Sequence, residues 1–287
     1  MMTQGENHSI DLRSWLETLE KHGELRRISA EVDWREEIGA VARINLSLDG
    51  PGLLFENIRD HKHTRCTKFL TGTLGNRRQV CLLLGLPTGT PDKAIIQHLR
   101  ACYRRGIPPV EVATGPVKTH KLAGADLDLG EFPVPHWHHL DGGRFIDTFC
   151  GVVTRNPKNG QMNVGIYRGQ VIAPDKIGKL LIPTQHWGSH FAEHRETSSP
   201  MPVAVVHGWH DVLPFCAGSP FPKGICEYDM MGAILGRPVE LVRCETSDLL
   251  IPASAEIVIE GTIDPNPATF EMEGPFGEYP GYAGGTP

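Results

Sequence analysis

The sequence predicts an α+β protein, with a small α/β domain at residues 1–110 and a β-rich domain at residues 111–287. Amphipathic helical patterns are concentrated in the first of these ranges. From Pro108 onward they give way to short β-branched segments separated by turn residues. The 32 glycines and 23 prolines make up about a fifth of the 287 residues, which indicates many turns and short strands.

The first domain mixes helical and extended patterns. Asp11 can cap a helix whose apolar residues recur at helical spacing and which ends at Gly23. Pro91 occupies the favoured first turn of a later helix. The patterns predict further helices at 36–48 and 91–103, an extended segment at 25–34, and buried strands at 53–55 and 80–84.

The second domain contains many short, β-branched segments. Residues 156–160 (Asn-Pro-Lys-Asn-Gly) predict a hairpin turn, because this composition is typical of such turns. A helix is predicted at 226–235. Strands are predicted at 110–113, 117–122, 146–155, 161–168, 203–206, 239–244 and 256–263.

Charge and composition exclude several classes of protein. The formal net charge is −6 and Lys and Arg are scattered, so no nucleic-acid footprint is expected. The apolar runs are far shorter than the ~20 residues that span a bilayer, and the polar start lacks a signal peptide. We therefore expect a cytoplasmic protein. The seven cysteines contain no Cys-x2-Cys pair and predict reduced, mostly buried thiols.

The loop predicted at 271–282 contains two glutamates around a stiff Gly-Pro-Phe-Gly core. Glu273 and Glu278 could therefore lie a few ångströms from one another or from a bound cofactor, as acid/base catalysis requires. An acidic surface turn is the simpler interpretation of such a spacing.

The histidine-rich segment 136–143 allows two interpretations. His136 and His138 would share one face of an extended segment, which suits a transition-metal site. Pro133 and Pro135 instead favour a stiffened loop whose imidazoles form hydrogen bonds or line a pocket, because the regular spacing of a zinc site is missing.

Asn163, His186 and Glu227 form a mixed, oxygen-leaning ligand set that suits Mn²⁺ or Mg²⁺. Sequence distance alone does not select them, and each residue taken alone is more simply interpreted as a satisfied polar residue or a helix-terminal carboxylate. Arg168 could orient a carboxylate substrate through bidentate hydrogen bonds, or form a surface ion pair.

Three segments match a known family. They are 163–168 (Asn-Val-Gly-Ile-Tyr-Arg), 251–261 (Ile-Pro-Ala-Ser-Ala-Glu-Ile-Val-Ile-Glu-Gly) and 273–278 (Glu-Gly-Pro-Phe-Gly-Glu). In these segments, and in order along the chain as far as Tyr282, the sequence resembles the UbiD-type decarboxylases, which use prenylated FMN. The resemblance implies reversible decarboxylation of an aromatic, heteroaromatic or α,β-unsaturated acid through a covalent adduct with the cofactor. It also implies that a split β-barrel of the flavin-reductase type follows the first domain.

The resemblance also assigns roles to residues. Arg168, Glu273 and Glu278 match the family's Glu-Arg-Glu catalytic network. The positions Asn163, His186 and Glu227 match those that hold a divalent cation, usually Mn²⁺, against the flavin phosphate. Ala217 and Ser219 lie in a loop whose carbonyls bind K⁺ in relatives. The positions implied to contact the cofactor are Asn163, Val164, Ile166, Tyr167, Arg168, Gln185, His186 and Glu227.

Family members are longer than this chain, because a C-terminal oligomerisation domain follows and helps close the active site. We therefore expect a fragment that is monomeric or weakly associated, whereas the whole protein would be a homo-oligomer. Expected partners are a small carboxylic acid, CO₂ and the flavin prenyltransferase that supplies the cofactor. Alternatives are an inert flavin- or metal-binding module and a flavin-reductase-like FMN protein; neither needs Arg168 with two glutamates.

One difficulty concerns strand geometry. Asn163 and Arg168 are separated by an odd number of residues, so strict alternation would place them on opposite faces of one strand. Both can reach one cofactor only if a bulge intervenes near Gly165 or if Arg168 lies beyond the end of the strand.

Overall fold

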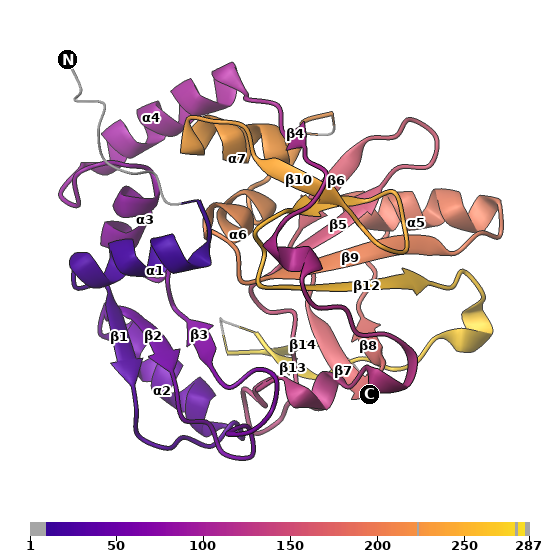
Figure 1. Ribbon diagram of the computed structural model, residues 1–287, viewed down its shortest axis with the longest axis horizontal. Helices are drawn as coiled ribbons and strands as arrows, with labels where there is room; N and C mark the ends of the chain where they lie inside the picture. Colours follow the sequence, from indigo (N-terminus) through magenta and orange to yellow (C-terminus); the bar gives the residue numbers. More distant parts are fainter. Residues whose placement is uncertain (1–9, 223, 279–280, 285–287) are drawn as a thin grey trace.

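The computed structural model describes residues 10–222, 224–278 and 281–284, which form a mixed α/β fold (Figure 1). In the N-terminal part, β1 pairs in parallel with β2, and β2 pairs antiparallel with β3. The elements of this part are α1 (Leu12–Lys21), β1 (Leu25–Ile28), α2 (Glu37–Ser47), β2 (Gly52–Phe55), β3 (Phe69–Thr71), α3 (Arg77–Leu83) and α4 (Asp92–Arg105).

Helix α1 begins as the sequence predicts. The Asp11 carboxylate accepts a hydrogen bond from the Ser14 backbone N–H, and the Ser14 hydroxyl interacts with the Asp11 backbone N–H in return. Trp15 and Leu19 are buried one turn apart. The indole Nε1 of Trp15 donates to Asp211 Oδ2 at 2.7 Å, so α1 is fixed against the second part of the chain.

This contact makes stability depend on pH. Burial is the largest influence on the Asp211 carboxyl and raises its pKa to about 6, from an ordinary 3.8. The unfolded chain therefore ionises first, so this group lowers the free energy of unfolding as pH rises from about 4 to 6, by up to about 3 kcal/mol. Asp211→Asn keeps an acceptor for Trp15 and removes this cost. Denaturant titration should find the variant more stable than the parent at pH 8.

The difference in free energy of unfolding between Asp211→Asn and the parent should be smaller at pH 5. At that pH much of the parent's Asp211 is protonated in the folded state. The exposed Asp175→Asn is the matched control and should change stability little at either pH. A variant that loses stability equally at pH 5 and pH 8 would show that the Asp211 charge does not limit the folded state.

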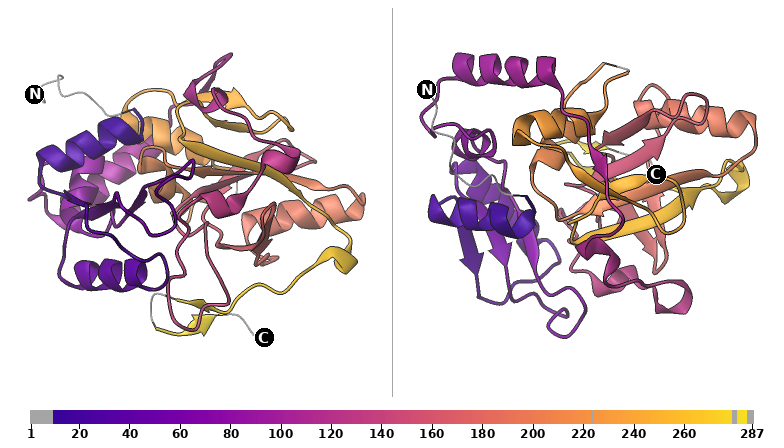
Figure 2. Two further views of the ribbon diagram at one scale, coloured as in Figure 1. Left: turned by 60° about the horizontal axis from the view of Figure 1, so that its bottom comes forward. Right: turned by 45° about the horizontal axis from the view of Figure 1, so that its top comes forward.

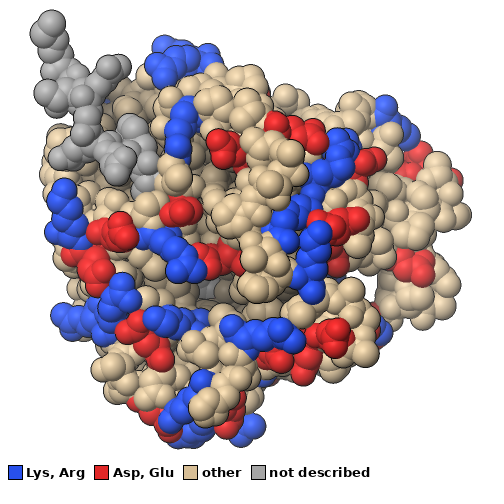
Figure 3. Space-filling view, in the orientation of Figure 1, with Lys and Arg blue, Asp and Glu red and all other residues tan. Residues whose placement is uncertain are grey.

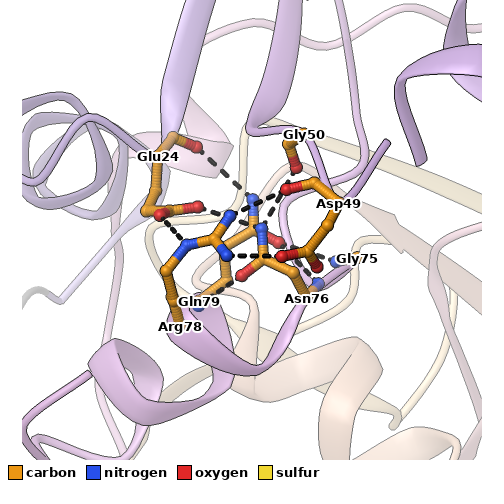
Figure 4. Close-up of polar contacts among 7 residues, drawn as sticks. All are labelled: Glu24, Asp49, Gly50, Gly75, Asn76, Arg78 and Gln79. Atoms are coloured by element: carbon orange, nitrogen blue, oxygen red, sulfur yellow. Dashed lines mark hydrogen bonds and ion pairs between the residues drawn. The ribbon is translucent and has the colours of Figure 1, made fainter. Parts of the chain in front are cut away.

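The prediction of a strand at 80–84 is wrong, because residues 80–83 lie in helix α3 and Leu84 is its C-cap. Asn76 and Gln79 form a capping box that satisfies the first backbone N–H groups of the helix. Glu24 accepts a hydrogen bond from Asn76 Nδ2 at 3.0 Å and forms an ion pair with Arg78 (Figure 4). The apolar run that indicates a buried strand is equally compatible with a short buried helix.

The second part is built around a four-stranded sheet in the order β12-β9-β5-β6, all antiparallel. A three-stranded sheet, β11-β10-β4, and two hairpins, β7-β8 and β13-β14, accompany it (Figure 2). The strands are β4 (Val110–Glu111), β5 (Gly151–Arg155), β6 (Met162–Gly165), β7 (Gly169–Ala173), β8 (Lys176–Lys179), β9 (Met201–His207), β10 (Glu240–Arg243), β11 (Leu250–Pro252), β12 (Ile257–Ile263), β13 (Phe276–Gly277) and β14 (Ala283–Gly284). The helices are α5 (His186–Glu196), α6 (Val212–Ala217) and α7 (Glu227–Leu235).

Several predicted strands in this part are wrong or too long. Residues 117–122 form no strand: a 3-10 turn at Pro116–Lys118 begins with a proline, and Val117 N donates to Ala253 O. The strand predicted at 146–155 begins only at Gly151, and the one at 161–168 ends at Gly165. Helices α5 and α6 were not predicted, because neither has a strong amphipathic pattern. Within the described residues, the strands form no closed barrel.

A large apolar core joins the two parts of the chain. Trp15 and Leu19 of α1 belong to the same buried cluster as Tyr228 and Met231 of α7. Beyond its acidic first turn, helix α7 is apolar from Met230 to Leu235 and is buried on nearly every side. The seven cysteines are free thiols, four buried and three partly buried, as predicted.

The described surface carries mixed charge. On the face shown in Figure 3, Lys and Arg alternate with Asp and Glu and form no extensive patch of one sign. None of the helices in the described part of the chain has the length and apolarity needed to cross a membrane.

Candidate functional site

Strand β6 and the turn that follows it organise the site. Tyr167 folds back against Gly165, where a Cβ would collide with the tyrosine ring. Its hydroxyl accepts a hydrogen bond from Asn163 Nδ2 at 3.2 Å, and its ring stacks on Trp187 at 4.2 Å between centroids. Because β6 ends at Gly165, Arg168 lies beyond the strand and its side chain is free of strand alternation. The second of the two geometries predicted for this segment is the one observed.

Arg168 forms hydrogen bonds with both glutamates of the 271–278 loop. Its Nε and Nη2 donate to the two oxygens of Glu273 at 2.8 and 2.9 Å, which is a bidentate pair. Its Nη1 donates to Glu278 Oε1 at 2.6 Å. Burial opposes the charge of Arg168, but its hydrogen bonds and ion pairs with Glu273 and Glu278 outweigh burial and raise its pKa.

The two glutamates differ in exposure. The Glu273 side chain is 4% exposed and the Glu278 side chain is 45% exposed. Glu273 is thus held against the guanidinium by two hydrogen bonds, whereas Glu278 accepts one from Arg168 and its side chain stays partly exposed to solvent. This difference suits one carboxylate that holds the arginine and another that exchanges a proton.

The histidine-rich segment supports the glutamate loop. Asp141 Oδ1 accepts a hydrogen bond from Gly277 N at 2.7 Å, and Gly142 N donates to Pro275 O at 2.7 Å. Gly277 has no room for a Cβ, because the His138 ring lies against it. The segment that offered a possible metal site therefore serves as a scaffold for Glu273 and Glu278.

The imidazoles of this segment form local contacts. His136 Nε2 lies 3.1 Å from Asp141 O, His138 lies 3.4 Å from the Asp141 carboxylate, and His139 is exposed beside Glu36. Among the residues that the structure describes, no group of three or more His, Cys, Asp and Glu side chains is arranged to hold a metal ion. The interpretation as a proline-stiffened, hydrogen-bonded loop agrees with this geometry.

A second polar group gathers on the opposite end of β6. His186 is the first residue of α5, and its Nδ1 lies 3.0 Å from Asn163 Oδ1. Glu227 is the first residue of α7, and its Oε2 accepts from Val164 N at 2.9 Å. Two helix N-termini, neither capped by a side chain, thus meet adjacent residues of one strand.

This arrangement fits a phosphate held through a divalent cation. Glu227 is 4% exposed and burial raises the pKa of its carboxyl, with no ion pair among the described residues to offset the charge. A cation would neutralise it, and the uncapped N–H groups of the two helices favour an anion. Asn, His and Glu supply the oxygen and nitrogen donors that Mn²⁺ or Mg²⁺ accepts.

A cavity of about 370 Å³ lies beside the Arg168 network. Gln185, the N-cap residue of α5, lines it and accepts a hydrogen bond from Trp187 Nε1. Leu180 and Ile182 also line it and are more than a third exposed, so apolar surface lies at its edge. The lining residues are Asp147, Thr148, Ile166, Tyr167, Arg168, Leu180, Ile182, Gln185, Phe276 and Glu278.

The predicted potassium loop begins only after Ala217, because Ala217 is the last residue of α6 and Ser219 alone of the two lies in the loop. Ser219 Oγ donates to Phe215 O at 2.8 Å, and Ser219 N donates to Cys216 O at 3.0 Å. A Cβ built on Gly218 would lie 3.5 Å from the Ile166 side chain, so Ala217 and Ser219 flank a position next to the cavity wall.

Some residues of the site were not predicted. Trp187, which stacks on Tyr167, directly follows His186, but its role depends on the unpredicted helix α5. Asp147 and Thr148 gave no sequence signal, because they lie inside a segment predicted to be an ordinary strand. Two aromatic side chains, Tyr167 and Phe276, line the cavity, and Tyr279 lies outside the described residues.

Comparison with known proteins identifies the family. Residues 16–99 match the 3-octaprenyl-4-hydroxybenzoate carboxy-lyase N-terminal domain, and residues 109–287 match the Rift-related domain of the same enzymes, known as UbiD. The chain is 34% identical over 281 residues to pyrrole-2-carboxylic acid decarboxylase of Pseudomonas aeruginosa, covering 96% of this chain and 56% of the relative. It is also 34% identical to phenolic acid decarboxylase of Bacillus subtilis, covering 96% and 59%.

Solved structures agree with these matches. The UbiD-class enzyme HmfF from Pelotomaculum thermopropionicum, in an evolved dimeric form with prFMN, superposes with a TM-score of 0.86 at 34% identity, covering 96% of this chain and 62% of that one. Vanillic acid decarboxylase of Sedimentibacter hydroxybenzoicus gives a TM-score of 0.89 at 31% identity, covering 96% and 59%. The chain belongs to the UbiD family, and it spans less than two thirds of the length of these relatives.

Proposed function

We propose that the protein catalyses the reversible, non-oxidative decarboxylation of an aromatic, heteroaromatic or α,β-unsaturated carboxylic acid with prenylated FMN as cofactor. The observation that carries this proposal is the contact of Arg168 with both Glu273 and Glu278 at the edge of the cavity. Simple FMN binding and hydride transfer need no such network, whereas carboxylate binding and protonation need both a cation and an acid.

Arg168, Glu273 and Glu278 have different roles in the proposed reaction. Arg168 orients the substrate carboxylate, because a guanidinium binds a carboxylate through two parallel hydrogen bonds. The buried Glu273 holds Arg168 in place, and the half-exposed Glu278 delivers the proton that replaces CO₂. The two carboxylates share one guanidinium and therefore titrate as a coupled set.

Asn163, His186 and Glu227 would hold Mn²⁺ or Mg²⁺ and, through it, the cofactor phosphate. Prenylated FMN, when bound, supplies an acceptor for the electron pair that CO₂ leaves behind. Val164, Ile166, Tyr167 and Gln185 are the further positions that would contact the cofactor. The carbonyls of Ala217 and Ser219 would bind K⁺.

Further parts of the proposal concern the whole protein. The β-rich domain would be a split β-barrel, and a flavin prenyltransferase would supply the cofactor. The whole protein would be cytoplasmic and homo-oligomeric. The chain of 287 residues would itself be monomeric or weakly associated. The exposed Leu180 and Ile182 support this assignment, because apolar residues at the edge of a cavity suit a surface that another domain covers.

The direct test is cofactor capture. The protein is co-expressed with a flavin prenyltransferase, purified, and examined by visible spectroscopy, mass spectrometry and metal analysis. The proposal expects prenylated FMN and a divalent metal in comparable amounts. Unmodified FMN alone would instead favour a flavin-reductase-like protein.

Asn163→Ala should remove cofactor and metal together. The substitution deletes the amide oxygen that contacts His186 and the donor to Tyr167, so flavin and metal content should fall at least about tenfold, as for other lost metal contacts. Asn159→Ala, in the exposed turn before β6, is the control and should retain both. Full flavin occupancy without metal in Asn163→Ala would refute a phosphate site that depends on the cation.

A further inference from the structure

A buried charge cluster lies directly behind the Arg168 turn. The Asp147 side chain is 0% exposed, with Lys179 at 10% and His207 at 16%. Asp147 Oδ1 lies 2.9 Å from His207 Nε2, and Oδ2 contacts Lys179 Nζ. The contact of Asp147 with Lys179 is an ion pair, and neither contact is aligned as a hydrogen bond. The catalytic roles described above use none of the three residues.

The cluster is connected to the backbone on both sides of Arg168. Lys179 Nζ donates to Tyr167 O at 2.9 Å. Gly169 O accepts from Ile146 N at 2.9 Å and from Asp147 N at 3.4 Å. The carbonyl before Arg168, on Tyr167, is therefore held by the side chain of Lys179. The carbonyl after it, on Gly169, is held by the backbone N–H groups of Ile146 and Asp147.

Local sequence agrees with a closely fitted turn. Gly169 has no space for a side chain, because a Cβ there would collide with the Asp147 carboxylate. Gly169 also pairs with Lys179 in the β7-β8 hairpin. Although burial opposes ionisation, Lys179 and His207 keep the pKa of Asp147 below its ordinary value, so the carboxylate stays charged and continues to attract the ammonium.

We propose that Lys179 is a positioning residue, which holds the Tyr167 carbonyl while anchored on Asp147 and thereby aims Arg168 at the substrate carboxylate. His207 completes the anchor by contacting the second oxygen of Asp147. The inference rests on the proposed function for the identity of what Arg168 binds. The positioning itself is a property of this chain and can be measured without substrate or cofactor.

A purely structural role makes a different prediction. If Lys179 serves only to neutralise a buried carboxylate, removing both charges should restore the native turn, because the cost of an unpaired buried charge disappears. If Lys179 positions the turn, the doubly neutral variant Asp147→Asn/Lys179→Met should fold but still lack the donor to Tyr167 O. The comparison of the single and double variants separates these roles.

The first readout is the Arg168 guanidinium itself, observed by ¹⁵N NMR in the cofactor-free protein. Its Nε–H signal is assigned by its absence in Arg168→Lys. In Lys179→Met and in the double variant, hydrogen exchange at this Nε–H should be at least about tenfold faster than in the parent, because a displaced Arg168 loses its bidentate contact. Lys158→Met, which removes an exposed ion pair with Glu196, should leave the signal unchanged.

The second readout is decarboxylation per bound flavin in the cofactor-loaded protein. Lys179→Met should lower kcat about 100-fold with a smaller change in KM, as expected when a catalytic group is misplaced by about an ångström. Parent-like exchange in Lys179→Met, or its restoration in the double variant, would overturn the proposal. If Lys179→Met does not fold, hydrogen exchange at the Arg168 Nε–H of the double variant alone tests the proposal. A parent protein without decarboxylase activity would contradict the proposed function, and the NMR result would still test the positioning.

Discussion

Glu278→Gln is expected to lower turnover by about 10² to 10⁴-fold while cofactor binding survives. The glutamine nearly preserves the shape of Glu278 and can still accept the hydrogen bond from Arg168 Nη1. It carries no exchangeable acid proton, so the carbon that loses CO₂ cannot be protonated from this position. The measurement is CO₂ release and substrate H/D exchange in the cofactor-loaded protein, each normalised to flavin content.

Glu271→Gln is the matched control for this variant. Glu271 lies in the same loop, and its contact is an exposed ion pair with Lys176. Because exposed pairs contribute little, its loss should leave turnover near the parent value. Parent-like decarboxylation and exchange in Glu278→Gln, at full flavin occupancy, would assign the loop a structural role and require another acid.

Arg168→Lys should also be severe, with a loss of at least about 100-fold in kcat/KM. The guanidinium makes three hydrogen bonds to two carboxylates, and its planar fork matches both oxygens of Glu273. An ammonium is a point charge and cannot reproduce this fork, so Glu273 and Glu278 would no longer share a fixed partner. Steady-state kinetics and flavin content are measured together.

Arg243→Lys provides a demanding control for the arginine. Arg243 also lies between two carboxylates, Glu111 and Asp248, but its side chain is 50% exposed. The same chemical change at this surface site should alter neither activity nor flavin content. If Arg168→Lys behaved like this control, the fork geometry would be irrelevant to the reaction and charge alone would suffice.

The separation of Arg168 from Asn163 along the chain determines only part of the site geometry. Alternation along a strand correctly indicated that Asn163 and Arg168 cannot both lie on one face of a regular strand, because their separation of five residues is odd. It could not choose between a bulge and an early strand end. Which of the two occurs depends on Tyr167. Its ring packs against Gly165, where a Cβ would collide with it, and stacks on Trp187.

The histidine-rich segment shows a different limit. Its composition allowed a metal site or a stiff loop, and only tertiary contacts distinguish them. Asp141, which has no distinctive spacing of its own, holds the loop of Glu273 and Glu278 from more than 130 residues away. Contacts of such sequence separation leave no periodic signal.

By itself the sequence determined the mixed helical and strand composition, the capped first helix, the free thiols and the family to which the chain belongs. These properties follow from local periodicity, capping chemistry and ordered motifs, each readable within a short window. Only the tertiary structure decided that 80–83 is helical, that the first residues of α5 and α7 contact β6, and that Asp147 and Lys179 lie behind Arg168. The physical reason is that buried charges and helix ends acquire their partners through packing between distant segments, which the order of residues along the chain does not display.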